Sequence, residues 1–260
     1  MSHDIQYFCI GHLAPSFQPR QAFTFVSSEA TADDKAVVIP DDSLGPLIDG
    51  KAISEYNQLF GLSTLPQITQ TPSRLFLFQY RKFLALSPGR ERAANISYAY
   101  TATPLEAPAF FPDHAKLLSL EPAILVGHPI SVHSLAHQYA AYHHVEDFCG
   151  LCAALSEIES FDSKRIAAFI NCTILIPAPS LGLFDPDVFV QQMQVLRNAW
   201  EVFAATFYHE RTGYQRRVGG FLLERLHSFL ITEQLSKSDT VAVAGHQIIV
   251  AAGSYVSPTT

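Results

Sequence analysis

The chain has 260 residues, enough for one large domain or two small ones with a substantial core. Hydrophobic residues make up 48% of it and charged residues 16%, so we expect a globular protein rather than a disordered one. The net charge of −7, without any basic run, argues against nucleic acid or an anionic membrane surface as the main partner. Basic residues cluster only locally, at 81–82, 90–92 and 216–217, which leaves room for a basic pocket.

No targeting or membrane segment is visible in the sequence. The N-terminus lacks the basic start and apolar run of a signal peptide. No apolar stretch approaches the ~20 residues that a bilayer span needs. We therefore expect a cytoplasmic protein without a transmembrane segment, for which peripheral membrane contact stays open.

The first half of the chain alternates short apolar runs with helical patterns. Residues 5–10, 22–26, 36–39 and 75–79 are predicted as strands, and 54–60 as a helix. Residues 88–122 hold many Pro and Ala with little periodicity, and we interpret them as a long loop excursion.

The second half continues the alternation, with strands predicted at 123–126 and 172–176 and helices at 131–142 and 146–159. The longest helix opens at Asp185-Pro186, because Asp is a favoured cap and Pro is favoured in the first turn. Residues 241–250, broken at Gly245, are interpreted as a hairpin. The alternation predicts one α/β domain over residues 1–260, with a mostly parallel central sheet flanked by helices.

The segment YQRRVGGFLLERL, residues 214–226, places charges in an apolar helical pattern. Arg217, Phe221 and Glu224 recur at helical spacing and share one face, where a half-buried charge needs a partner. Gly219-Gly220 indicates a helix start or a close backbone approach. On this segment alone, an ion-paired structural helix is favoured over the wall of an anion site.

Two further segments carry groups suited to transfer chemistry. Arg81 and Lys82 follow a predicted buried strand directly, where ligands bind in open α/β sheets, and two cations there suit a diphosphate. His143-His144-Val145-Glu146-Asp147 puts imidazole beside carboxylate, as a general base needs. Acidic residues near a helix start explain the same pattern equally well.

Three metal or thiol patterns are weaker. Cys149 and Cys152 form a lone CxxC pair within a helical pattern, so a redox or zinc role is disfavoured. His133 and His137 share a helical face, but no carboxylate lies at ligand spacing. Asp185-Pro186-Asp187 matches an Asp-x-Asp motif that holds a divalent ion in nucleotide-sugar enzymes, yet helix capping explains it fully.

Six short segments, spread over most of the chain, follow one another in an order that can be compared with a known family. They are Ile10-Gly11-His12 after the first strand, residues 49–57 (DGKAISEYN), residues 79–83 (QYRKF), Gln138-Tyr139 followed by residues 143–147 (HHVED), residues 171–174 (NCTI), and residues 217–226 (RVGGFLLERL). In this order they resemble the "HYRR" family of capsular-polysaccharide and lipopolysaccharide glycosyltransferase-like proteins, long labelled a domain of unknown function.

The resemblance has departures. Gln79 stands where the family has the histidine of its name, Lys82 replaces the second arginine, and Leu13 replaces a lysine. The family's Trp-Lys-Asn element is missing. Gln79 cannot act as a base, and Lys82 lacks the bidentate fork of arginine.

The resemblance implies a bacterial hexosyltransferase with a GT-A-like fold. Its donor would be a nucleotide-diphospho-sugar, and its acceptor a growing surface polysaccharide or a lipid-linked saccharide. Such a reaction needs cations for the departing diphosphate and a base for the acceptor hydroxyl. Metal-independent stabilisation is favoured over Mg²⁺ or Mn²⁺. The competing interpretations are a degenerate relative that binds nucleotide or glycan without turnover, and a thiol enzyme built on the CxxC pair.

The candidate residues follow from motif position and chemistry. Asp147 is the first choice of base, with His144 and Glu224 behind it. Arg225 is the ion-pair partner expected to orient Glu224. The diphosphate candidates are Arg81, Lys82 and Arg217. The remaining candidates are His12, Asp49, Ser54, Asn57, Gln79 and Tyr80 for the donor, with Gln138 and His143 nearby.

Overall fold

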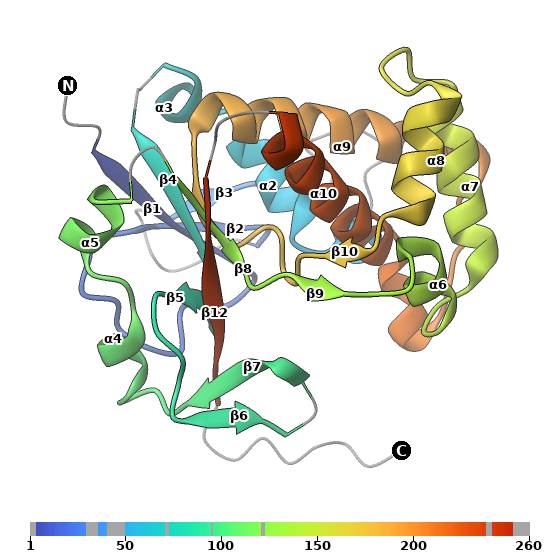
Figure 1. Ribbon diagram of the computed structural model, residues 1–260. Coiled ribbons are helices and arrows are strands. Elements are labelled where there is room, and N and C mark those ends of the chain that lie inside the picture. The colour runs from blue at the N-terminus through green and yellow to red at the C-terminus, as the bar shows by residue number, and fades with distance from the viewer. Residues whose placement is uncertain are drawn as a thin grey trace.

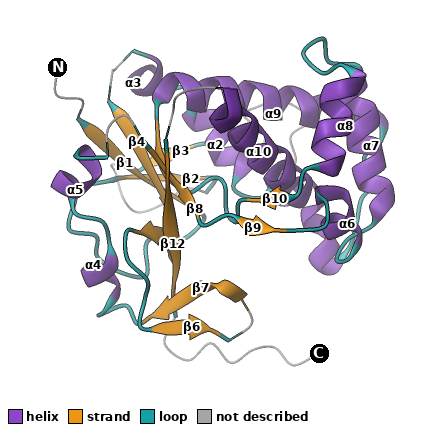
Figure 2. Ribbon diagram, in the orientation of Figure 1, coloured by secondary structure: helices purple, strands orange, loops and turns teal. Residues whose placement is uncertain are grey.

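The computed structural model describes residues 4–29, 36–40, 50–70, 73–94, 96–120, 123–237 and 241–251. Figure 1 shows a central sheet with a layer of helices on one face, short helices on the other, and a helical group at one end. Figure 2 separates the same view by element type, with the strands of the main sheet gathered in one half of the molecule. In the described part of the chain, no helix is both long and apolar enough to cross a membrane.

The main sheet has a mixed order with parallel pairing at its centre. In the described residues its order is β3 (Val37–Val38), β2 (Thr24–Ser27), β1 (Ile5–Ile10), β4 (Arg74–Gln79), β11 (Gly182–Phe184), β8 (Ile124–Gly127), β12 (Ala242–Val250), β7 (Ile96–Ala102) and β6 (Glu91–Ala93), and β5 (Lys82–Ala85) pairs with β12 and β4. Strands β3 to β4 are parallel to one another, as are β8, β12 and β7, whereas β11, β5 and β6 run antiparallel to their neighbours. The predicted mixed α/β fold with a mostly parallel central sheet is confirmed.

The strands bury side chains on both faces, as a sheet covered on both sides must. In β1, Phe8 and Ile10 join the core on one face while Tyr7 and Cys9 join the core on the other. The same alternation in β4 sends Leu75 and Leu77 one way and Phe76 and Phe78 the other. The larger core lies under the helices, and a smaller aromatic core covers the opposite face.

The helices divide between these layers (Figure 1). The described helices are α1 (Gly50–Ile53), α2 (Tyr56–Leu62), α3 (Pro66–Thr69), α4 (Ala107–Phe110), α5 (His114–Leu118), α6 (Leu135–Ala140), α7 (Val145–Ser156), α8 (Ser163–Asn171), α9 (Pro186–Thr206) and α10 (Val218–Lys237), with the 3₁₀ helix η1 (Gly213–Arg217) before α10. A two-stranded ribbon, β9 (Ile130–Ser131) and β10 (Ile174–Leu175), lies apart from the main sheet.

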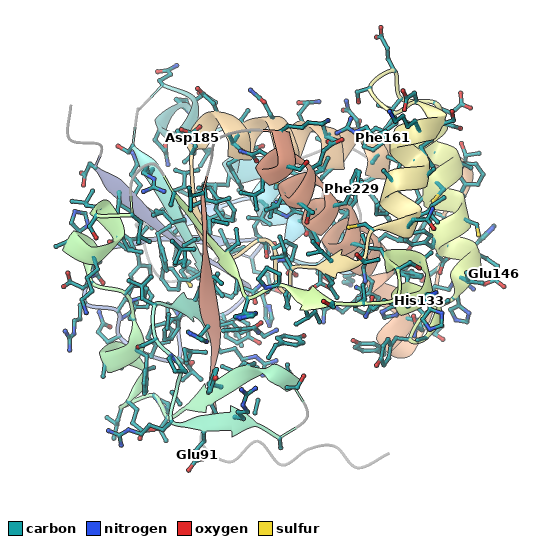
Figure 3. All side chains as sticks on the ribbon, viewed as in Figure 1. Glu91, His133, Glu146, Phe161, Asp185 and Phe229 are labelled. Atoms are coloured by element: carbon teal, nitrogen blue, oxygen red, sulfur yellow. The ribbon has the colours of Figure 1, made fainter. Side chains whose placement is uncertain are left out.

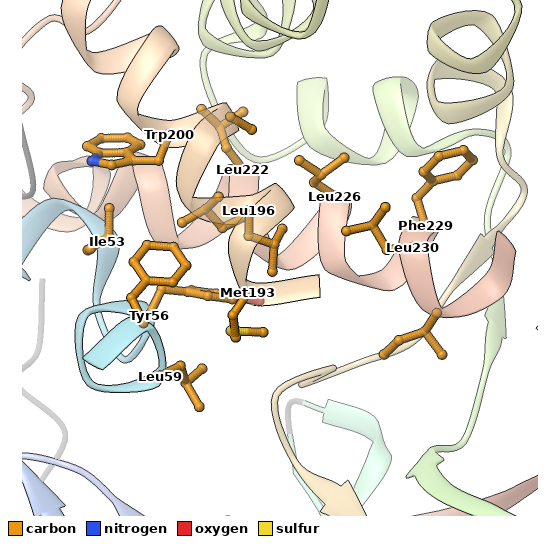
Figure 4. Packing of buried hydrophobic residues seen from close by; sticks show 14 of the residues in the cluster. Ile53, Tyr56, Leu59, Met193, Leu196, Trp200, Leu222, Leu226, Phe229 and Leu230 are labelled. Carbon is orange, nitrogen blue, oxygen red and sulfur yellow. The ribbon is translucent and has the colours of Figure 1, made fainter. Parts of the chain in front are cut away.

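Helices α9 and α10 form the main core together. Asp185 caps α9, accepting hydrogen bonds from the backbone N–H groups of Asp187 and Val188 at 3.0 and 3.2 Å, as predicted. Trp200 of α9 packs against Ile53 of α1 (Figure 4). A Cβ on Gly219 would stand 2.5 Å from the Trp200 ring and 2.8 Å from Ile53, so the start of α10 requires glycine there. Gly219-Gly220 thus marks both a helix start and a close approach.

Two sequence predictions were wrong. The described part of residues 88–122 is not a long loop, because it forms the β6–β7 hairpin and the short helices α4 and α5. Residues Ala242–Val250 form one continuous strand rather than a hairpin. Gly245 is needed there for space, since a Cβ would lie 3.0 Å from a Leu125 methyl group. The strand predicted at 172–176 is present as β10, but it pairs with β9 outside the main sheet. Helix α8 was not predicted.

Candidate functional site

A cavity of about 430 Å³ lies at the carboxyl ends of β2, β1 and β4. It is lined by Ile10, Gly11, His12, Ser28, Glu29, Lys51, Ser54, Glu55, Gln58, Gln79, Tyr80, Arg81, Lys82 and Arg217. The chain leaves β1 toward β2 and β3 and returns to β4 on the other side of β1. The cavity therefore lies at the point where the strand order reverses, which is where open α/β sheets bind ligands.

The strand ends bring the predicted N-terminal elements together. In the parallel register Ile10 pairs with Val26 of β2 and with Gln79 of β4, so the three strands end level. A Cβ on Gly11 would stand 3.1 Å from the Tyr80 ring, so glycine lets Tyr80 lie close to β1. The rings of His12 and Tyr80 meet edge to face at 5.2 Å between centroids.

The cavity is cationic in an acidic protein. Its wall carries Lys51, Arg81, Lys82 and Arg217 against Glu29 and Glu55, so four cations and two carboxylates leave a formal excess of two positive charges. The whole chain carries −7. Neither Arg81 nor Lys82 makes an ion pair within 4 Å of a carboxylate among the described residues. Such a wall attracts an anionic ligand.

Glu55 links the elements that surround the cavity. Gln79 Nε2 donates to Glu55 Oε1 at 3.2 Å, and Arg217 Nη2 lies 3.8 Å from Glu55 Oε2. Arg217 Nε also donates to Ser54 Oγ at 2.8 Å. Ser54 has a φ of 56°, a left-handed conformation that costs a non-glycine residue energy and that clusters at functional sites. A Cβ on Gly220 would stand 2.8 Å from Ser54 Oγ, so the Ser54 turn also depends on that glycine.

Lys82 lines the same cavity and is only partly exposed. Burial lowers the pKa of Lys82 below its usual range, while Glu55 and Glu224 oppose that shift and Arg81 and Arg217 add to it. A partly dehydrated ammonium gains more from an anionic ligand than a hydrated surface lysine does. Glu224 lies one turn of α10 beyond Gly220, which abuts the lining residue Ser54, so Glu224 stands close to the cavity wall.

Glu224 itself belongs to a polar network beside the cavity. Its Oε2 accepts from Arg225 Nη1 at 2.9 Å, and its Oε1 accepts from the backbone N–H of Ala178 at 3.3 Å. Arg225 Nε donates to Gln138 Oε1 at 3.0 Å, and the Arg225 side chain is only 7% exposed. The expected Glu224–Arg225 ion pair is thus present, and Arg225 also joins Gln138 to it. Ala178 has a φ of 47°, a second strained position next to a candidate residue.

Three further candidates, Asp147, His144 and Asn57, do not line the cavity. Asp147 is 4% exposed, lies in the first turn of α7 and accepts from Arg211 Nη2 at 2.9 Å. His144 is the exposed N-terminal cap position of α7, without a capping side-chain hydrogen bond. Asn57 is fully buried and donates to the Ile39 backbone oxygen at 3.4 Å. Asp49 lies outside the described residues.

Sequence reasoning missed Glu55, together with Lys51 and Gln58. Lys51 belongs to α1, Glu55 is the N-cap of α2, and Gln58 lies within α2, so no single helical face joins them. The left-handed turn at Ser54 brings them to the cavity, and no local pattern in the sequence indicated that turn. Asn57, which the motif emphasised, is buried in the core.

The weaker metal and thiol patterns have structural explanations. Burial raises the pKa of Cys152 to about 12, with Cys149 adding to the shift, so the Cys152 thiol is neutral near pH 7. Asp185 is occupied as a helix cap, and Figure 3 shows Asp185 and His133 in separate parts of the molecule. Among the described residues, no group of three His, Cys, Asp or Glu side chains is arranged to hold a metal ion.

Comparison with known proteins identifies the fold. No family model matches the sequence, and no curated protein matches it significantly. Among solved structures, the chain superposes on the apo structure of WbbM, a bifunctional glycosyltransferase, with a TM-score of 0.72 and 15% identity. This chain has a glycosyltransferase fold. The match covers 97% of this chain and 46% of the WbbM chain, so the chain spans about half the length of that structure. The architecture is consistent with the GT-A-like fold expected from the sequence.

Proposed function

We propose that this protein is a glycosyltransferase of hexosyl type, moving a sugar from a nucleoside-diphospho-sugar to a surface-polysaccharide or lipid-linked saccharide acceptor. The observation that carries the proposal is the cationic cavity at the carboxyl ends of β2, β1 and β4, within a glycosyltransferase fold. The ordered resemblance to the "HYRR" family supports the same activity, and we propose that the chain is a member of that family.

The diphosphate of the donor binds to Arg81, Lys82 and Arg217. All three line the cavity, and they come from the β4–β5 turn and from the end of η1. Arginine offers paired N–H donors to phosphate oxygens, and the half-buried ammonium of Lys82 adds a point charge. As the bond between the anomeric carbon and the phosphate oxygen breaks, negative charge grows on the diphosphate, and these cations stabilise it. Transfer without a divalent metal, retained in the presence of a chelator, is the expected behaviour.

Glu224 is the base that the arrangement favours. Of the three candidates, Asp147 is 4% exposed and therefore closed to an acceptor hydroxyl, and His144 lies at the exposed start of α7. Glu224 is 35% exposed, lies within electrostatic range of Lys82, and is held in place by Arg225 and the Ala178 N–H. In the proposed step its carboxylate takes the proton of the acceptor hydroxyl, the hydroxyl oxygen bonds to the anomeric carbon, and the diphosphate leaves with the bonding electron pair.

A thermal-shift panel tests donor binding. UDP, GDP, ADP and dTDP, with their glucose conjugates, are added with and without Mg²⁺, and at least one is expected to raise the melting temperature. Arg217→Ala should lower the affinity for that ligand at least tenfold, because the lost guanidinium is one of the three cations that bind the diphosphate. Arg216→Ala is the matched control, since Arg216 is the preceding residue, is also exposed, and does not line the cavity.

The outcomes separate the two candidate functions. Absence of any shift across the panel would contradict the donor site. A shift without hydrolysis or transfer of the sugar would favour a degenerate relative that binds nucleotide alone, the alternative that the substitutions at Gln79 and Lys82 raise. Loss of transfer in Glu224→Gln with unchanged nucleotide affinity is the result expected of a base.

A further inference from the structure

An aromatic cluster stands beside the cavity, at the start of α10. The rings of His143 and Phe221 stack at 4.1 Å between centroids with an interplanar angle of 21°. Tyr214 of η1 lies 4.9 Å from Phe221 and stacks over His143 at 6.2 Å and 21°. Tyr214 is nevertheless 66% exposed. Its ring is therefore held in one orientation by two neighbours while most of its surface faces solvent.

This aromatic cluster is continuous with the cavity. The guanidinium of Arg217, which lines the cavity, stands 5.6 Å from the centroid of the Phe221 ring. Glu224 follows Phe221 by three residues on the same helix, so both project from one face of α10. The cluster thus continues from the cavity, through Arg217 and Phe221, to the exposed ring of Tyr214.

The polar atoms of this cluster have fixed roles. Gln215 Nε2 donates to the Tyr142 backbone oxygen at 3.1 Å, so Gln215 Oε1 accepts from His143 Nδ1 at 3.1 Å. Burial lowers the pKa of His143, so its ring is neutral near pH 7. A neutral ring that carries its proton on Nδ1 presents Nε2 as a hydrogen-bond acceptor. Beside an exposed tyrosine face there are therefore two acceptors, His143 Nε2 and the Glu224 carboxylate.

We propose that Tyr214, with His143 and Glu224, binds the acceptor saccharide, whose ring packs on the Tyr214 face. A pyranose ring has an apolar C–H face and a rim of hydroxyl donors, which matches an aromatic face bordered by acceptors. A purely apolar partner would leave the acceptors unpaired, and a phosphorylated partner would be repelled by Glu224. The inference rests on the proposed transfer, because Glu224 then receives the proton of the hydroxyl presented to it.

Saccharide binding and nucleotide binding are measured separately in the whole protein. Methyl glycosides of glucose, galactose, mannose and N-acetylglucosamine are titrated by saturation-transfer NMR, alone and with whichever nucleoside diphosphate the thermal-shift panel selects. At least one glycoside should bind the wild type. Tyr214→Ala and Tyr214→Leu should each lower the affinity for that glycoside roughly tenfold, as expected for loss of a stacked ring. The nucleotide affinity of both variants should be unchanged. Tyr214→Phe should bind as the wild type does.

Tyr142→Ala is the matched control, because Tyr142 is 69% exposed and the substitution keeps the backbone oxygen that holds Gln215. It should leave glycoside affinity unchanged. Failure of every glycoside to bind, or equal binding by the wild type and both Tyr214 variants, would overturn the acceptor site. Weakened nucleotide binding in Tyr214→Ala would overturn it too, by assigning the ring to the donor. Glycoside binding without any nucleotide binding would instead refute the donor site and leave the saccharide surface standing.

Discussion

Two polar networks meet at the Ser54–Glu55–Tyr56 turn and use their side chains in opposite ways. The cavity network joins Ser54 and Glu55 to Gln79 and Arg217 and is charged and partly exposed. The interior polar chain starts one residue later, at Tyr56, and is neutral and buried.

The interior polar chain consists of Tyr56, His227, Gln192 and Gln234. Gln192 Nε2 donates to Gln234 Oε1 at 2.9 Å, so Gln192 Oε1 accepts from His227 Nε2 at 3.2 Å. His227 Nδ1 is then left to accept from the Tyr56 hydroxyl at 3.3 Å. Burial lowers the pKa of His227 to about 3, which keeps the ring neutral.

The difference shows what each network does. Inside the core, each of these three hydrogen bonds pairs one donor with one acceptor, which is how buried polar groups avoid a desolvation cost. In the cavity, cations outnumber carboxylates, and the Arg217–Glu55 distance of 3.8 Å is too long for a hydrogen bond. The interior network supports the fold, and the cavity keeps charge available for a ligand.

The largest expected effect is a difference in the free energy of unfolding between the Arg225→Ala and Arg217→Ala variants. Arg225→Ala removes a buried guanidinium that serves Gln138, Glu224 and the Phe221 backbone oxygen, so the free energy of unfolding should fall by about 3 kcal/mol. Arg217→Ala should change it by less than about 1 kcal/mol, because that side chain is 51% exposed. Urea denaturation of both variants measures the difference. Equal losses would contradict the assignment of Arg225 to the fold and of Arg217 to ligand binding.

The next effect is a pH dependence from the interior polar chain. Between pH ~6.5 and ~3 the unfolded chain binds a proton at His227 that the folded chain does not, so stability falls as the pH falls through that window. Between pH ~7.5 and ~5 this group alone should cost about 2 kcal/mol.

His227→Gln isolates this contribution, because glutamine keeps a donor for Gln192 and does not titrate. Unfolding free energies at the two pH values should show the wild type losing about 2 kcal/mol more than the variant. Parallel curves for the two proteins would mean that His227 titrates normally in the fold.

Most elements of the fold could be predicted from local patterns in the sequence. Alternating burial in β1 and β4 and the Asp185 cap depend on residues within a few positions of one another, so periodicity and capping rules predicted them. The β6–β7 hairpin escaped prediction because its strands lie at the sheet edge and are only partly buried, which leaves little apolar alternation. Gly245 led to the wrong prediction of a hairpin, because the glycine makes room for the Leu125 side chain, which is distant in the sequence.

Residues of the site could be predicted where their position in the sequence, directly after a buried strand or within a motif, was enough to place them at the cavity. Arg81 and Lys82 line the cavity because they follow a buried strand, and Arg217 does so as the motif suggested. Asp147 was placed by chemistry rather than position, and its pairing with Arg211, 64 residues away, is a tertiary contact that no local pattern encodes. Glu55 was overlooked because the motif drew attention to its neighbours.

The smallest expected effect tests whether the two networks are independent. Tyr56→Phe removes one hydroxyl from the interior polar chain and keeps the ring packing against Phe60, so the unfolding free energy should fall by about 1 kcal/mol. Nucleoside diphosphate affinity should be unchanged, because Ser54 and Glu55 are held from the cavity side by Arg217 and Gln79. Isothermal titration of Tyr56→Phe beside Arg217→Ala measures both properties. A tenfold loss of nucleotide affinity in Tyr56→Phe would show that the interior polar chain also positions the Ser54–Glu55 turn, and the two networks would then have to be treated as one site.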